Sequence, residues 1–80
     1  MEIRILAFGI AKDIIKKANL KLEVENGSTV GELRNSLERQ YPDFSKLASL
    51  RFAVNSDYVQ DDYLLEKGDE VVLIPPVSGG

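Results

Sequence analysis

The chain has 80 residues, 44% hydrophobic and 29% charged, which is ordinary usage for a single globular domain with one core. It contains no cysteine and no histidine, which excludes disulfides, a thiolate nucleophile, zinc sites built on sulfur and the commonest groups for proton transfer. A formal net charge of −3 disfavours binding to phosphate backbones, so we expect protein partners and no nucleic acid.

The N-terminal segment alternates in polarity and predicts a strand over residues 2–8. One face carries Ile3, Ile5 and Ala7, and the other face ends in two apolar side chains, Leu6 and Phe8. The segment has charges at Glu2 and Arg4, and no run approaches the roughly 20 apolar residues that span a bilayer. We therefore expect a soluble protein that is cytoplasmic or organellar and contacts no membrane.

Residues 10–18 have apolar side chains at helical spacing, which predicts a short helix whose apolar face holds Ile10, Ile14 and Ile15. The stretch 20–25 alternates again and predicts a strand that returns beside the first, with its apolar face made by Leu20, Leu22 and Val24. Asn26 and Gly27 follow as a turn signal.

Thr29 and Glu32 have the spacing of a capping box, in which each side chain bonds to a free amide at a helix start. The helix that follows has an apolar stripe made by Val30, Leu33 and Leu37. We expect this main helix to end near Tyr41, because Pro42 disfavours helical geometry in the residue before it.

The C-terminal part of the domain predicts further strands. Residues 50–54 alternate, with one face made by Leu50, Phe52 and Val54. A turn at 55–57 precedes a short strand that begins with Tyr58 and Val59, and the connection that follows is expected to be anchored by Leu64 and Leu65. Residues 70–74 are apolar at both parities, which is typical of a strand covered on both faces.

This order of elements predicts an α+β fold of the β-grasp (ubiquitin-like) type, with a mixed sheet of four to five strands and one main helix across one face. We place the domain at residues 1–74 and an extended tail at 75–80.

The polar side chains offer little chemistry. The adjacent carboxylates Asp61-Asp62 and Asp69-Glu70 are interpreted as solvated turn residues, since further oxygen ligands at fixed spacing are missing. Four glycines lack a phosphate-loop pattern and are assigned to turns and packing, namely Gly9, Gly27, Gly31 and Gly68. Three tyrosines are interpreted as core or rim residues, namely Tyr41, Tyr58 and Tyr63. Four lysines either form a basic patch or only solvate an exposed face, namely Lys12, Lys16, Lys17 and Lys21.

The tail differs from the rest of the chain. Pro75 and Pro76 fix φ and offer no backbone donor, so sheet pairing ends there, and Val77 and Ser78 act as a spacer. Gly79 and Gly80 lack Cβ atoms and could pass through a narrow channel of a partner. A terminal carboxylate becomes reactive as an acyl adenylate, which a sulfur donor converts to a thiocarboxylate. We therefore expect the terminal carboxylate of Gly80 to be the reactive group of the protein.

An exposed apolar patch is expected beside the tail. Leu6 and Phe8 point away from the core side of the first strand, and the last strand turns either Val72 and Ile74 or Val71 and Leu73 outward. If these two strands are neighbours, the outward residues form one patch, and such patches mark interfaces. A loop of the domain that covers this patch is the alternative.

Several segments together resemble the small subunits of molybdopterin synthase, a β-grasp family of sulfur carriers related to ubiquitin and to the thiamine sulfur carrier. They are Ala7-Phe8, Thr29-Val30 with Leu33, Ala53-Val54-Asn55 and, most specifically, GDEVVLIPPVSGG at 68–80. The family often has Arg-Glu where this chain has Lys12-Asp13.

The resemblance implies that a ubiquitin-activating-like adenylyltransferase uses ATP to adenylate Gly80, which then becomes a thiocarboxylate. The tail would enter the large subunit of molybdopterin synthase and sulfurate cyclic pyranopterin monophosphate to form the dithiolene. Contacts to that subunit are implied for Phe8, Tyr58 and Ile74 and for the tail residues Pro75, Pro76, Val77 and Ser78. The chain would be a non-catalytic subunit that binds no metal or cofactor itself.

Three alternatives stay open at this point. The chain could carry sulfur for thiamine or another thio-cofactor, it could be a ubiquitin-like modifier that forms isopeptides through the same activated end, or it could be an interaction domain with an inert tail.

Overall fold

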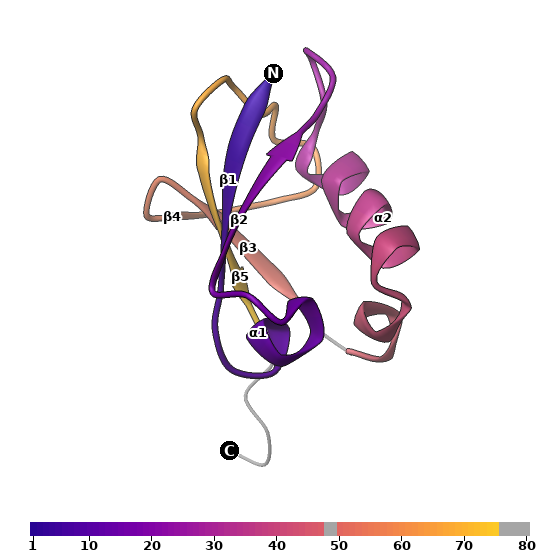
Figure 1. Cartoon of the computed structure of the whole chain (residues 1–80). Helices are drawn as coiled ribbons and strands as arrows, with labels where there is room; N and C mark the ends of the chain where they lie inside the picture. Colours follow the sequence, from indigo (N-terminus) through magenta and orange to yellow (C-terminus); the bar gives the residue numbers. More distant parts are fainter. Residues whose placement is uncertain (48–49, 76–80) are drawn as a thin grey trace.

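In the described part of the chain, five strands form one mixed sheet, and a long helix lies across one of its faces (Figure 1). The computed structural model describes residues 1–47 and 50–75. Its elements, in chain order, are β1 (Glu2–Ala7), α1 (Gly9–Ile15), β2 (Asn19–Glu23), α2 (Val30–Gln40), the 3-10 helix η1 (Pro42–Lys46), β3 (Arg51–Val54), β4 (Asp57–Val59) and β5 (Glu70–Ile74).

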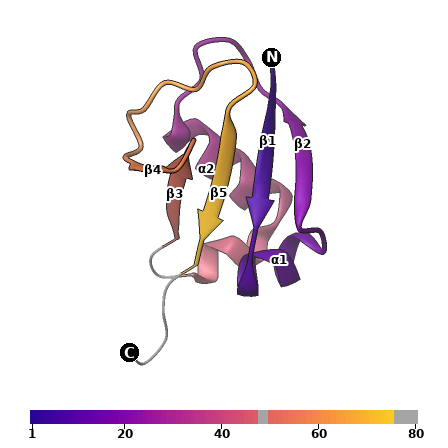
Figure 2. The same cartoon turned by 90° about the vertical axis from the view of Figure 1, so that its left-hand side faces the viewer.

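The sheet has the order β2-β1-β5-β3-β4, so the last strand lies at its centre. β5 runs parallel to β1 and antiparallel to β3, while β1–β2 and β3–β4 are antiparallel pairs (Figure 2). This mixed sheet, with one main helix on one face, confirms the predicted α+β, β-grasp arrangement.

The core lies between the sheet and α2. β1 and β5 bury alternate side chains on the helix side, namely Ile3, Ile5, Ala7, Val71 and Leu73. α2 buries its predicted stripe, Val30, Leu33 and Leu37, and β3 adds Phe52 and Val54. The alternation of β1 and β3 and the stripe of α2 therefore identified core residues, whereas β5 is apolar at both parities and its buried face was left open by the sequence.

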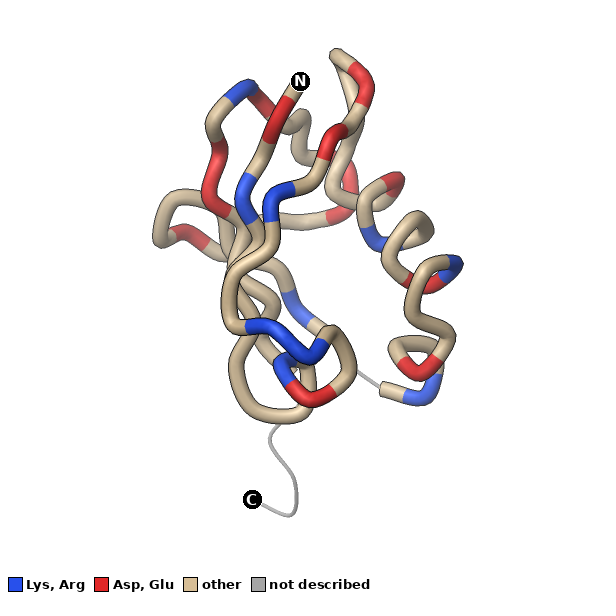
Figure 3. The backbone as a smooth tube through the Cα atoms, in the orientation of Figure 1, with Lys and Arg blue, Asp and Glu red and all other residues tan. Residues whose placement is uncertain are grey.

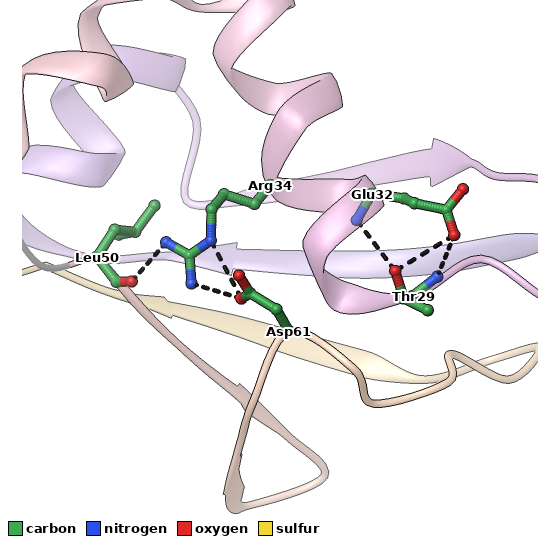
Figure 4. A network of polar contacts seen from close by, with 5 residues as sticks. All are labelled: Thr29, Glu32, Arg34, Leu50 and Asp61. Atoms are coloured by element: carbon green, nitrogen blue, oxygen red, sulfur yellow. Dashed lines mark hydrogen bonds and ion pairs between the residues drawn. The ribbon is translucent and has the colours of Figure 1, made fainter.

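The predicted capping box at the start of α2 is confirmed (Figure 4). The Glu32 backbone N–H donates to Thr29 Oγ1 at 3.2 Å, and the Thr29 N–H donates to Glu32 Oε1 at 3.0 Å. These bonds satisfy two amides that the helix itself leaves without partners. The helix ends at Gln40, with Tyr41 as its C-cap, and Pro42 then begins η1, which the sequence pattern did not predict.

Thr29→Ala should lower the free energy of unfolding by about 1 kcal/mol, because it removes the oxygen that accepts from the Glu32 amide. Urea unfolding followed by circular dichroism measures the change. Thr29→Ser is the matched control, since it keeps the hydroxyl and should stay close to the parent chain. Equal destabilisation by both substitutions would show that the methyl group, and not the cap, stabilises this helix start.

Two predictions were wrong, the place of Ile10 on the apolar face of the first helix and the role of Leu64 as an anchor of the connection after β4. Ile10 is 47% exposed, because α1 begins at Gly9 and turns Ala11 and Ile15, one turn apart, toward the sheet. Leu64 is 61% exposed, because it pairs with Thr29 in an isolated antiparallel bridge and only the next residue, Leu65, points inward. Both errors come from apolar residues that are adjacent to the buried ones in the chain.

The strand at 70–74 is not covered on both faces within the described residues. Val71 and Leu73 are fully buried, whereas Val72 and Ile74 are half-buried on the face opposite α2. Its second apolar face therefore belongs to an open side of the sheet, which corrects the expectation of a strand covered on both faces.

Asp69 corrects another expectation, since it is only 6% exposed and is no solvated turn residue. Its carboxylate accepts hydrogen bonds from Asn55 Nδ2 at 3.0 Å and from the Glu66 backbone N–H at 2.8 Å. The carboxylate thus ties the turn before β5 to the turn between β3 and β4, and a buried carboxylate with such partners is structural.

Asp69→Ala should lower the free energy of unfolding by about 2 kcal/mol, because it leaves the Asn55 and Glu66 donors without their acceptor. Thermal and urea unfolding measure the effect. Asp62, an aspartate of the same connection between β4 and β5, is exposed, so Asp62→Ala is the matched control and should change stability by less than about 0.5 kcal/mol. Equal effects of the two substitutions would contradict the structural role of Asp69.

Candidate functional site

The face of the sheet opposite α2 carries a continuous row of apolar side chains, and it faces the viewer in Figure 2. The register places Leu6 beside Val72 and Val72 beside Ala53, and Ala53 pairs with Tyr58 on the edge strand β4. Phe8 continues the alternation of β1, since its backbone is extended (φ −130°, ψ 158°). We call this surface the apolar strip, and it consists of Leu6, Phe8, Ala53, Tyr58, Val72 and Ile74.

The apolar strip is open to solvent at its ends. Phe8 is 57% and Tyr58 66% exposed, and Leu6, Val72 and Ile74 are half-buried. The adjacency of β1 and β5 and the outward parity of Val72 and Ile74 confirm the conditional prediction of a patch here. The alternative of a covering loop finds no support in the described ranges, because a covering loop would bury Phe8 and Tyr58.

The strip borders the root of the C-terminal segment. β5 ends at Ile74 and Pro75 follows, next to the turn that leads from β1 into α1. Gly9 forms that turn with φ +56°, and a Cβ at this position would lie 3.7 Å from Pro75 Cγ. The predicted tail residues Pro76, Val77, Ser78, Gly79 and Gly80 lie outside the described residues, so their roles stay predictions.

An arginine on α2, which sequence reasoning missed, fixes the segments that flank Tyr58 (Figure 4). Arg34 Nη1 donates to the Leu50 carbonyl at 2.8 Å, and its Nη2 donates to Asp61 Oδ1 at 3.0 Å. Its guanidinium carbon lies 4.7 Å from the centroid of the Phe52 ring. Arg34 thus joins the start of β3 to the segment after β4, between which Tyr58 is presented. Because its carboxylate accepts from Arg34, Asp61 is not simply a solvated turn residue, which corrects the expectation from the sequence.

The titratable side chains of the described part offer no metal site and no obvious catalytic group. No group of His, Cys, Asp or Glu residues in these ranges could hold a metal ion. Partial burial raises the pKa of the Tyr63 phenol, and the Asp69 carboxylate raises it further, so this phenol stays protonated near neutral pH. No helix within the described ranges combines the length and apolar character needed to cross a membrane. The apolar strip is therefore the main candidate surface.

Comparisons with known proteins agree with one another. The model of the ThiS family matches residues 5–80. The molybdopterin synthase sulfur carrier subunit of Arabidopsis thaliana is 31% identical over 81 residues, which cover 100% of this chain and 84% of the relative.

Two solved structures are similar over the full length of both chains. A chain of the complex of subunits 1 and 2 of the molybdopterin-converting factor from Helicobacter pylori has a TM-score of 0.70 and 27% identity. SAMP1 from Haloferax volcanii has a TM-score of 0.84 and 21% identity, which shows the fold alone. Each comparison covers 100% of both chains.

Proposed function

Because the chain belongs to the ThiS family, we propose that it is the sulfur carrier subunit of a molybdopterin synthase and that its C-terminal glycine carries the sulfur. The observation that carries this proposal is the full-length similarity to curated sulfur carrier subunits, together with an exposed apolar strip at the root of the C-terminal segment. The similarity supports the activity, and the strip supports the delivery of the segment to a partner.

The proposed chemistry begins at the carboxylate of Gly80. One carboxylate oxygen attacks the α-phosphorus of ATP in an adenylyltransferase and releases pyrophosphate, which leaves an acyl adenylate. A sulfur donor at the oxidation level of sulfide then attacks the acyl carbon and displaces AMP, which leaves a thiocarboxylate. Its sulfur attacks an oxygen-bearing carbon of cyclic pyranopterin monophosphate, and that carbon–oxygen bond breaks. Water then cleaves the acyl–sulfur bond, which returns the carboxylate and leaves the sulfur on the substrate. The dithiolene holds a pair of sulfur atoms, so its synthesis takes repeated deliveries.

The folded body contributes docking in this proposal. The H. pylori neighbour comes from a complex of subunits 1 and 2, which supports a large subunit as the partner of this chain. The apolar strip would bury Phe8, Tyr58 and Ile74 against that subunit. Pro75 fixes the direction in which the chain leaves the sheet, and the glycines at 79 and 80 have no Cβ to obstruct a narrow channel.

Mass spectrometry of the intact chain tests the proposal. After incubation with the adenylyltransferase, ATP and a sulfur source, the chain should gain the mass difference between sulfur and oxygen. Addition of the large subunit and cyclic pyranopterin monophosphate should restore the original mass and form the dithiolene product. Covalent conjugates with other proteins would instead identify a modifier, and transfer to a thiazole-forming enzyme alone would identify a thiamine carrier. An unchanged mass would contradict every carrier function.

A further inference from the structure

Positive charge is concentrated in the first part of the chain. Residues 1–21 hold five of the ten Lys and Arg but only two of the thirteen acidic residues, whereas the whole chain has a net charge of −3. Figure 3 shows basic segments on α1 and the turn after it, at the end of the sheet where β5 ends. Acidic segments gather around the opposite end, near the N-terminus. The molecule is therefore electrically polar along the sheet.

Three lysines lie in the segment that begins beside Pro75. Lys12, Lys16 and Lys17 are exposed on α1 and the turn after it, and α1 begins at Gly9, whose position abuts Pro75. The backbone at Lys16 is fixed as the C-cap of α1, with φ 67° and its N–H donating to the Lys12 carbonyl. Of the acidic residues, only Asp13 belongs to the same helix.

Arg51 supplies positive charge on the other side of the apolar strip. Its Cα pairs with that of Ile74 across β3 and β5, which places it beside the last strand residue before Pro75. The side chain is exposed, and its guanidinium carbon lies 6.0 Å from the centroid of the Tyr58 ring. The aromatic ring favours this position of the cation and so holds the charge within the strip.

These four cations have no ion pair in the described ranges, unlike three other basic residues. Arg4 pairs with Glu70, Arg34 with Asp61 and Lys46 with Asp43. Within residues 1–47 and 50–75, Lys12, Lys16, Lys17 and Arg51 have no carboxylate within the 4.0 Å of an ion pair. Three further basic residues of the described ranges, Lys21, Arg39 and Lys67, likewise have no ion pair. The four cations differ from these in position, since Lys12, Lys16 and Lys17 lie on α1 and the turn after it, and Arg51 lies beside Ile74. Their positive charge is thus available to a partner. It lies at one end of a molecule that is acidic overall, and this end would attract an acidic surface.

We propose that these four residues form a cationic rim around the apolar strip, and that the large subunit carries Asp and Glu side chains around the groove that receives the tail. The rim consists of Lys12, Lys16, Lys17 and Arg51. This inference rests on the proposed function. Because the rest of the chain is net negative, an acidic partner attracts only the rim and repels the remainder. The encounter is therefore oriented, with the tail foremost, and the apolar strip completes the docking.

Charge reversal with a matched control tests the inference. Lys16→Glu/Lys17→Glu and Arg51→Glu change the rim, whereas Lys67→Glu makes the same kind of change at an exposed lysine in the turn before Gly68. The association rate with the large subunit is measured by stopped flow in low and high salt. In low salt the double reversal should slow association about 10-fold or more, and Lys67→Glu should change it by less than about 2-fold. High salt should remove most of this difference in rate, because it screens the attraction between exposed charges that are more than a Debye length apart.

The outcomes separate the two proposals. Rim variants that associate as fast as Lys67→Glu, or a parent chain whose association is indifferent to salt, would overturn the cationic rim while the sulfur carrier function stands. A parent chain that takes up sulfur but does not bind the large subunit would overturn both the synthase assignment and the rim. Lys16→Arg/Lys17→Arg should associate like the parent chain, because it keeps the charge.

Discussion

A chain without Gly79 and Gly80 should give no sulfur transfer above an assay that lacks the carrier, and its unfolding transition should stay unchanged. The proposed reactive atom belongs to the backbone terminus, so no side chain can replace it. The described strands end at Ile74, and the buried core lies within residues 3–73, so the deletion removes none of these contacts. Dithiolene formation in the reconstituted synthase and urea unfolding measure the two effects.

Two further variants identify which step is lost. An alanine added after Gly80 should prevent transfer, because the acyl group would then sit on a residue with a Cβ and in the wrong register. A parent chain prepared chemically as the thiocarboxylate should sulfurate the substrate with the large subunit alone, without ATP or the adenylyltransferase. Normal product formation by the shortened chain would refute the assignment of Gly80.

Phe8→Glu should weaken binding to the large subunit by about 100-fold or more, because it places a charge where the proposed contact buries a large aromatic side chain. Phe8 is already exposed, and its side chain makes no capping hydrogen bond to α1, so the fold should tolerate the change. Isothermal titration calorimetry with the isolated large subunit measures the affinity. Ile74→Glu should act in the same direction, at the root of the tail.

Leu64→Glu is the matched control for this prediction. Leu64 is 61% exposed and apolar, as Phe8 is, but it lies outside the strip, beside the start of α2. Its replacement should leave the affinity within about 2-fold of the parent chain. If Phe8→Glu and Leu64→Glu bound equally well, the apolar strip would not be the docking surface.

Sequence patterns were reliable where a short-range rule decides the structure. The capping box of Thr29 and Glu32 needs only residues of one turn, and it was found as predicted. The outward parity of Leu6 follows from alternation within its strand. Residues 70–74 are apolar at both parities, so only the structure shows that Val72 faces outward. Leu6 and Val72 lie in one strip only because β1 and β5 are adjacent. This adjacency is a property of the topology, and the predicted β-grasp order of strands supplied it.

Long-range contacts account for what the sequence could not predict. Arg34 and Asp61 are 27 residues apart, and nothing in the helix pattern distinguishes Arg34 from other polar positions. Asp69 reads as an ordinary turn residue until Asn55, 14 residues away, is brought beside it. Ile10 and Leu64 show the reverse case, because a large apolar residue next to a buried one in the chain has no pattern of its own that marks it as exposed.

The central position of β5 in the sheet has a consequence for folding during translation. β1 and β3 are not neighbours, since each pairs with β5, which is the last of the described strands to leave the ribosome. Until then the sheet has a gap at its middle, and Val72 and Ile74 are absent from the surface. A nascent chain without β5 therefore lacks two of the six residues of the apolar strip, so partners should bind only chains in which β5 has joined the sheet.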